Sequence, residues 1–354
     1  AIPRTAATTY EVGIATIVPS VPIEVSSIVF FVIVWALTIN RSKVVDRLGK
    51  YLTPFLLLTL FAIVVAAVIN PIGTPGAAAE PAYNFAGGFT EGYQTMDALA
   101  ASMFAGVALS NIVARGYNNR EEQLSMSIRC GVIAAVLLGL VYCGLTYGGA
   151  GATGAFPADI DRSALLIGMT SGLLGSIGAY CLSVAVILAC LTTAIGLTVT
   201  TGEYFNELSG GKFSYKLVVT LTVIAALLIS VLGVTTIINL AVPFLNMVYP
   251  VLMALVICNC LDRFIPNKNA YIGALIGAFL ISFIDGLSAV GSLGISADWI
   301  DSLLEFKANL PLASFGLSWV IPAVVLAIVC SFIPRKKQDS AEIVYEIFDE
   351  GKDD

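Results

Sequence analysis

The stretch "AYCLSVAVILACLTTAIGLTVTTGEYF", from Ala179 to Phe205, has no charged residue before Glu203. A helix of about 20 apolar residues is long enough to cross the hydrocarbon core of a bilayer. Two adjacent threonines, Thr192 and Thr193, lie near the middle of the stretch. The stretch therefore predicts a membrane-spanning helix, and its paired hydroxyl groups need an explanation.

Composition places the whole chain in the same class. Of its 354 residues, 58% are hydrophobic and only 12% are charged, and the mean hydropathy is +0.91. Soluble domains are about a quarter charged. A soluble core cannot cover this much apolar surface, so the composition predicts an all-α membrane protein with several spans. The chain also has no histidine and no CxxC pair among its seven cysteines, which argues against zinc sites, disulfide frameworks and histidine-dependent catalysis.

Nine apolar stretches are long enough to cross a bilayer as helices. They are 23–40, 52–70, 96–114, 130–150, 178–200, 216–236, 238–261, 270–292 and 314–333. The segment 1–18 is too short for a complete span and has no charged leader, so we interpret it as the end of a helix that begins before Ala1. We therefore expect a transmembrane domain over 1–334, a charged tail over 335–354, and a chain that is part of a longer protein.

Lysine and arginine are distributed unevenly among the segments that join these spans. Fifteen of the 18 lie in or beside alternate segments, namely 41–51, 115–129, 201–215, 262–269 and the tail. The other loops, 71–95, 151–177 and 293–313, hold only Arg162 and Lys307. Because cytoplasmic loops carry the excess of positive charge, the first set is predicted to be cytoplasmic, and so is the C-terminus.

Two short echoes indicate an internal repeat. "TTYE" at Thr8 resembles "TTGE" at Thr200, and "PFL" at Pro54 resembles "PFL" at Pro243, with nearly equal offsets of 192 and 189 residues. The predicted orientation makes Pro54 open a helix from the cytoplasmic side and Pro243 open one from the outside. Paired elements that run in opposite directions are typical of the inverted repeats of transporters.

The threonine pair has two interpretations. A threonine in a membrane helix commonly donates its hydroxyl to a backbone carbonyl one turn earlier. Alternatively, Thr192 and Thr193, together with the carbonyl of Ala189, form part of a neutral oxygen cage, which suits a monovalent cation that must leave again. Both interpretations stay open from the pattern alone.

A second candidate site lies in "TEGYQTMDALAASMFAGVALSNI", from Thr90 to Ile112. Its small residues around Phe104 are typical of a close helix–helix contact. They are equally typical of a discontinuous helix whose exposed backbone binds a substrate or an ion, and in that case the backbone is expected to open at Ala105–Gly106.

Four ionisable residues fall within predicted spans, where such residues are costly and often functional. They are Arg4, Glu11, Asp97 and Asp285. Arg4 and Glu11 are seven residues apart and share a helix face, and Arg4 is expected to pair with a carboxylate from a neighbouring helix. Asp97 is expected near the start of its helix, where a negative charge is favourable.

The segments "PRTA" (Pro3–Ala6), "TMDALA" (Thr95–Ala100) and "CLTTAIGL" (Cys190–Leu197) closely resemble those of the bacterial branched-chain amino acid: cation symporters, within the amino acid–polyamine–organocation superfamily. The resemblance runs from residue 1 to about residue 333. It implies a LeuT-type inverted-repeat fold with twelve spans, of which this chain lacks the first two and part of the third.

The resemblance also implies roles for individual residues. Ala189, Thr192 and Thr193 correspond to a sodium site, to which Ala189 gives its carbonyl. Leu197 corresponds to an apolar wall of the substrate site, and the unwound helix corresponds to Ser102, Phe104, Ala105 and Gly106. The first unwound helix of that fold, which completes both sites, has no counterpart here.

These expectations define a non-enzymatic carrier in a bacterial cytoplasmic membrane. It would take up L-leucine, L-isoleucine or L-valine with sodium as the coupling ion, and would need no cofactor and no nucleic acid partner. The alternatives are a proton-coupled or exchange-type carrier of another small amino acid, an intramembrane aspartyl protease using Asp97 and Asp285, and a channel. The protease lacks a GxGD context, since Asp285 lies in "FIDGLS", and no charged ring or carbonyl filter indicates a channel.

Overall fold

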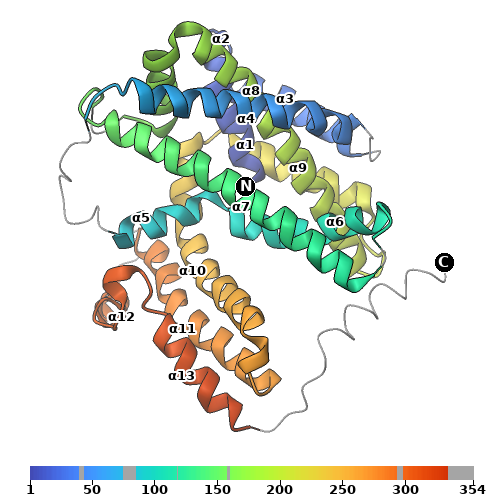
Figure 1. Ribbon diagram of the computed structural model, residues 1–354, viewed down its shortest axis with the longest axis vertical. Helices are drawn as coiled ribbons and strands as arrows, with labels where there is room; N and C mark the ends of the chain where they lie inside the picture. Colours follow the sequence, from blue (N-terminus) through green and yellow to red (C-terminus); the bar gives the residue numbers. More distant parts are fainter. Residues whose placement is uncertain (40–43, 75–84, 118, 158–159, 293–297, 334–354) are drawn as a thin grey trace. The chain divides into compact units, whose positions relative to one another are not determined.

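The computed structural model describes residues 1–39, 44–74, 85–117, 119–157, 160–292 and 298–333. All regular structure in these ranges is helical (Figure 1). The chain forms two compact units, unit 1 (Ala1–Ala79 and Ser102–Asn239) and unit 2 (Glu80–Ala101 and Leu240–Asp354). The predicted tail, 335–354, lies outside the described residues.

Unit 1 contains the first helices of the chain and the longest one. Its elements are α1 (Ile2–Thr8), the π-helix η1 (Thr9–Ile14), α2 (Ala15–Ile17), α3 (Ile23–Thr38), α4 (Val44–Ile69), α7 (Arg120–Gly151), α8 (Arg162–Leu208) and α9 (Tyr215–Ser230). Side-chain caps begin two of these helices. Asn119 Oδ1 accepts from the Glu121 amide before α7, and Ser214 Oγ accepts from the Leu217 amide before α9.

Unit 2 contains the remaining helices. They are α5 (Phe85–Gly92), the 3₁₀ turn η2 (Tyr93–Thr95), η3 (Asp262–Phe264), α11 (Lys268–Ser292), α12 (Asp298–Ala308), η4 (Ala313–Phe315) and α13 (Val320–Ser331). Two helices begin in one unit and end in the other, α6 (Asp97–Ala114) and α10 (Val234–Cys260).

Each of the nine predicted spans overlaps a helix. By length and composition, four helices in the described ranges are long and apolar enough to cross a membrane: Arg120–Gly151, Arg162–Leu208, Val234–Cys260 and Lys268–Leu287. The exposed side of α7 carries large apolar side chains such as Val132, Ile133 and Val136. Such a surface is stable against lipid and not against water. The chain is an all-α membrane protein with several long apolar helices.

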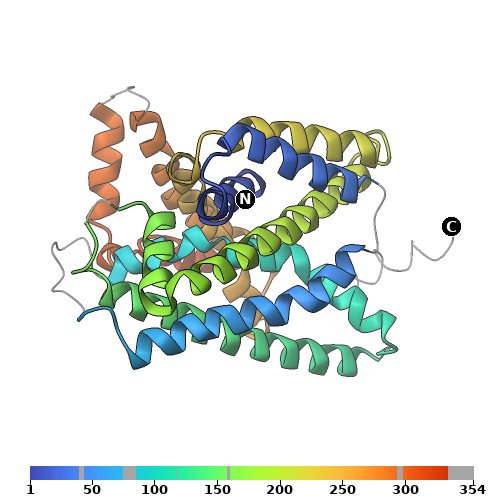
Figure 2. The same ribbon diagram turned by 90° about the horizontal axis from the view of Figure 1, so that it is seen from above.

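Unit 1 is built around α8. Figure 2 shows this helix between α4 on one side and α3 with α9 on the other. Ala194 and Ile195 of α8 are fully buried with Phe31 of α3 and Val223 of α9 in one apolar cluster. Gly175, with φ +66°, divides α8, so the predicted span 178–200 lies wholly in its second part.

The π-helix η1 is bonded to α8 across their contact. A π-helix leaves a backbone carbonyl without its usual helical donor, and Ser183 Oγ of α8 donates to the Val12 carbonyl at 2.8 Å. Gly13 permits the approach, because a Cβ there would lie 2.4 Å from Cγ1 of Ile187. The position of η1 on α8 therefore depends on a residue with no side chain.

In unit 2, α11 and α13 run side by side with very close backbones (Figure 1). A Cβ on Gly273 would lie 2.3 Å from the Leu326 carbonyl oxygen, and one on Gly277 would lie 2.5 Å from that of Pro322. Small residues four apart allow this approach between membrane helices. Asn267 holds the ends together, since its Oδ1 accepts from the Ala270 amide while its Nδ2 donates to the Ser331 carbonyl.

Four expectations about these segments are wrong. The opening predicted at Ala105–Gly106 is absent, because α6 is continuous there. The chain breaks earlier, at Met96, which has φ 61°. The segments 71–95, 151–177 and 293–313, expected as loops, contain α5, the first part of α8 and α12, respectively.

Candidate functional site

The predicted cation ligands lie together on α8. Thr192 Oγ1 donates to the Ala189 carbonyl at 3.0 Å, so two of the three predicted ligand oxygens are in contact. Both residues are half-buried, whereas Thr193 is exposed. The bond uses the single proton of Thr192 but leaves lone pairs on both oxygens. The local helix bond and a cation site are therefore compatible interpretations of the same geometry.

Two further threonine hydroxyls are buried in unit 1. Thr198 is completely buried, and its Oγ1 has no hydrogen-bond partner within the described ranges. Thr9, buried at the start of η1, lies beside Cys190, the residue that follows Ala189. In the sequence Thr9 stands out only as part of a repeat, because its buried position next to α8 depends on tertiary packing. No cluster of three or more cysteine and acidic residues capable of holding a metal occurs in the described ranges.

The predicted substrate residues divide into two groups. Leu197 is buried, and the Phe104 ring of α6 packs against its neighbour Gly196, since a Cβ on Gly196 would lie 3.4 Å from Phe104 Cζ. Ser102, Ala105 and Gly106 instead lie on exposed parts of the continuous helix α6. The structure therefore brings Phe104 to the Leu197 region of α8.

The interruption between α5 and α6 is the feature that sequence reasoning placed wrongly. The Met96 amide donates to the Tyr93 carbonyl at 3.1 Å, and Asp97 then begins α6. The Tyr93 ring stacks on Tyr249 with ring centroids 4.6 Å apart. Asp97 lies in the first turn of α6, as expected for a carboxylate near a helix start. A break of this kind interrupts the helical hydrogen-bond ladder, which is how broken helices present backbone groups to a ligand.

The four ionisable residues occupy separate surroundings. In unit 1, Glu11 accepts from Ser163 Oγ at 2.6 Å and from the Val234 amide at 2.8 Å. Arg4, also in unit 1, is half-buried near Cys190. In unit 2, Asp285 forms an ion pair with Lys307 of α12. The partner of Asp285 was missed because Lys307 lies in a segment expected to be a plain loop.

Comparison with known proteins gives one consistent result. A family profile described as "Branched-chain amino acid transport protein" matches residues 1–337. The branched-chain amino acid permease BraB of Bacillus subtilis (strain 168) is 38% identical over 340 residues, which cover 93% of this chain and 74% of that protein. The Staphylococcus saprophyticus protein named "Putative branched-chain amino acid carrier protein SSP1343" is 33% identical over 362 residues, covering 98% of this chain and 79% of its own length.

No solved structure matches the chain. The profile nevertheless covers all the described helices, and the two relatives are named as a permease and a carrier protein. The protein belongs to the branched-chain amino acid transport protein family, whose members are transporters and not enzymes.

Proposed function

We propose that the protein is a sodium-coupled carrier that takes up L-leucine, L-isoleucine and L-valine across a bacterial cytoplasmic membrane. The substrate class comes from the family and from relatives named as branched-chain amino acid permease and carrier. Transport proceeds by alternating access around a site within the membrane. Ion and substrate are coupled because both favour the same conformation.

The observation on which sodium coupling rests is the contact between Thr192 Oγ1 and the Ala189 carbonyl. It supplies two neutral oxygens at a half-buried position on an apolar helix, and Thr193 offers a third on the same turn. Sodium is bound by such oxygens, and neutral ligands allow it to leave again. Leu197 and Phe104 form the apolar wall for the substrate side chain.

A LeuT-type inverted repeat is part of the proposal. Pro54 and Pro243 were expected to open helices, but they lie inside α4 and α10. The two "PFL" echoes still occupy similar places within long helices. The "TTYE" echo lies in α1 and η1, and the "TTGE" echo lies near the end of α8. Together with the broken helix, these correspondences support the repeat.

The test is sodium activation of leucine uptake into proteoliposomes that contain the protein at its full natural length. Thr192→Ala and Thr193→Ala should each raise the sodium concentration for half-maximal uptake about tenfold, which corresponds to about 1.4 kcal/mol. Thr200→Ala is the matched control, because Thr200 Oγ1 makes the same kind of bond, to the Gly196 carbonyl, on the same helix.

Uptake that is equally fast in choline and in sodium would exclude sodium coupling. If such uptake followed an imposed proton gradient, the carrier would be proton-coupled. Unchanged sodium activation in both threonine variants would remove these residues from the ion site.

A further inference from the structure

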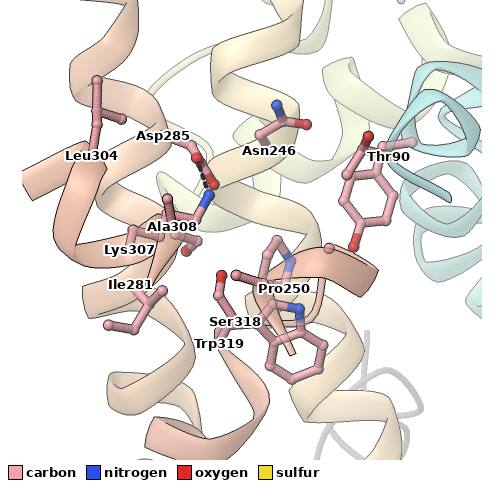
Figure 3. A pocket seen from close by; sticks show the side chains of 14 residues that line it. Thr90, Asn246, Pro250, Ile281, Asp285, Leu304, Lys307, Ala308, Ser318 and Trp319 are labelled. Atoms are coloured by element: carbon pink, nitrogen blue, oxygen red, sulfur yellow. Dashed lines mark hydrogen bonds and ion pairs between the residues drawn. The ribbon is translucent and has the colours of Figure 1, made fainter. Parts of the chain in front are cut away.

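Unit 2 contains a pocket of about 230 Å³ bounded by α5 with η2, α10, α11, α12 and the segment around η4 (Figure 3). Its lining is mixed: Asn246, Ser282, Asp285 and Lys307 are polar, and Ile281 and Leu304 are among the apolar residues. A single small amino acid fits this space.

The two charged residues of this lining face one another. Figure 3 shows Asp285 of α11 and Lys307 of α12 joined as an ion pair. Their side chains are only 21% and 24% exposed, respectively. A partly buried ion pair adds little net stability, because desolvation offsets much of the attraction, while removing one partner alone leaves a costly charge. A ligand that carries both charges can replace both partners at once without leaving either charge unpaired.

The zwitterion of an α-amino acid is such a ligand. Its ammonium group suits the Asp285 carboxylate, and its carboxylate suits the Lys307 ammonium. Ser282 Oγ donates its proton to the Met247 carbonyl at 2.8 Å, so toward the pocket its oxygen acts as an acceptor for an ammonium group. The amide of Asn246 can donate or accept. The apolar residues of the lining, such as Ile281 and Leu304, then suit an aliphatic side chain.

We infer that this pocket is a second binding site for an aliphatic amino acid zwitterion. The ligand's ammonium group replaces Lys307 as the partner of Asp285, and its carboxylate replaces Asp285 as the partner of Lys307. The choice of leucine as ligand rests on the proposed function. The site is separate from the threonine pair and the Phe104–Leu197 region, which belong to unit 1. Binding here would also exchange the ion pair between α11 and α12 for contacts to the ligand.

Trp319 provides a local signal, since it lines the pocket and is one of only three tryptophans in the chain. In a Trp35→Phe, Trp299→Phe background of the full-length protein, leucine should produce a saturable change in Trp319 fluorescence. Two probes test the need for both charges. These are 4-methylpentanoate, which lacks the ammonium group, and 3-methylbutylamine, which lacks the carboxylate, and neither should produce the change.

The double variant Asp285→Asn, Lys307→Gln removes both charges together and so leaves no unpaired charge. It should weaken the fluorescence response to leucine at least tenfold. Glu305→Gln, at an exposed position of the same helix α12, is the matched control and should leave the response unchanged. If the double variant does not fold, Ala308→Leu fills the pocket and keeps the ion pair, and it should weaken the response equally.

The outcomes separate this inference from the proposed function. Leucine uptake without any Trp319 response, or a response that survives both the double variant and Ala308→Leu, overturns the second site and leaves the carrier function standing. A response equally strong to the amine or the acid alone overturns the zwitterion as ligand. A Trp319 response in a protein that takes up no leucine would support the site and contradict the proposed function.

Discussion

At the scale of single residues, Glu11 shows how a charged group is accommodated in an apolar helix. Its two carboxylate oxygens accept from Ser163 Oγ at the start of α8 and from the Val234 amide at the start of α10. The first amides of a helix have no partner within the helix, and a carboxylate there is favoured by the helix dipole. Glu11 therefore joins η1 to the beginnings of two other helices.

Replacing Glu11 should separate this bonding role from the charge. Glu11→Ala leaves the Val234 amide without its acceptor and should lower the free energy of unfolding by about 2 kcal/mol. Glu11→Gln keeps an oxygen that can accept from that amide, so it should lower the free energy of unfolding by roughly half as much. The stability of both variants is measured by heating the purified protein and recording the loss of monodisperse material on size-exclusion chromatography. A glutamine variant less stable than the alanine variant would contradict the capping role.

At the scale of elements, glycine sets the distance between helices at two places. Gly13 brings η1 onto α8, and Gly273 with Gly277 brings α11 onto α13. In the bilayer, apolar contact alone does not drive helices together, so close packing of backbones supplies much of the attraction. A methyl group at either contact meets backbone or a packed side chain.

Gly277→Ala tests the contact between α11 and α13. The new Cβ would lie 2.5 Å from the Pro322 carbonyl oxygen and 2.6 Å from the Ala323 Cα, so the helices must move apart. We expect a loss of about 1–3 kcal/mol, typical of overpacking. The control is Gly139→Ala in α7, where a Cβ meets nothing within 4 Å and helix propensity improves. Equal thermal midpoints for the two variants would show that the close contact between α11 and α13 contributes nothing to stability.

At the scale of the whole molecule, the uneven distribution of lysine and arginine sets the expected orientation. The segment 262–269 belongs to the positively charged set and 293–313 to the other, and α11 runs between them. The helix is therefore expected to begin at the cytoplasmic side and to end at the outer side. Both ends belong to unit 2, so the expectation needs no information about unit 1.

Single cysteines test this orientation in a background from which the seven native cysteines have been removed. Asn309→Cys should react with a membrane-impermeant thiol reagent in intact cells. Phe264→Cys, at a position whose side chain is 80% exposed, should react only after the cells are opened. The reverse pattern would invert the proposed topology.

Local patterns predicted much of the architecture. The nine spans and the family follow from composition, hydropathy and short motifs, and all nine stretches overlap helices. The placement of Asp97 at a helix start was also predictable, because it depends only on the adjacent sequence. The contact of Thr192 with Ala189 follows from helical spacing in the same way.

The break at Met96 and the partners of the charged residues had no such local signal. A φ of 61° at a non-glycine residue is imposed by its surroundings. The small residues nearby instead predicted a break at Ala105–Gly106. Ser163 and Val234 lie 152 and 223 residues after Glu11, so no spacing pattern joins them.

The sequence by itself determined the membrane class, the positions of the long helices and the family, because the free energy of placing a segment in lipid depends chiefly on that segment's own side chains. Only the tertiary structure decided which carboxylate meets which partner, where the chain breaks between α5 and α6, and which helices bound the pocket around Asp285 and Lys307. Those features depend on contacts between segments that are distant in sequence. Lys307 of α12, for example, pairs with Asp285 of α11.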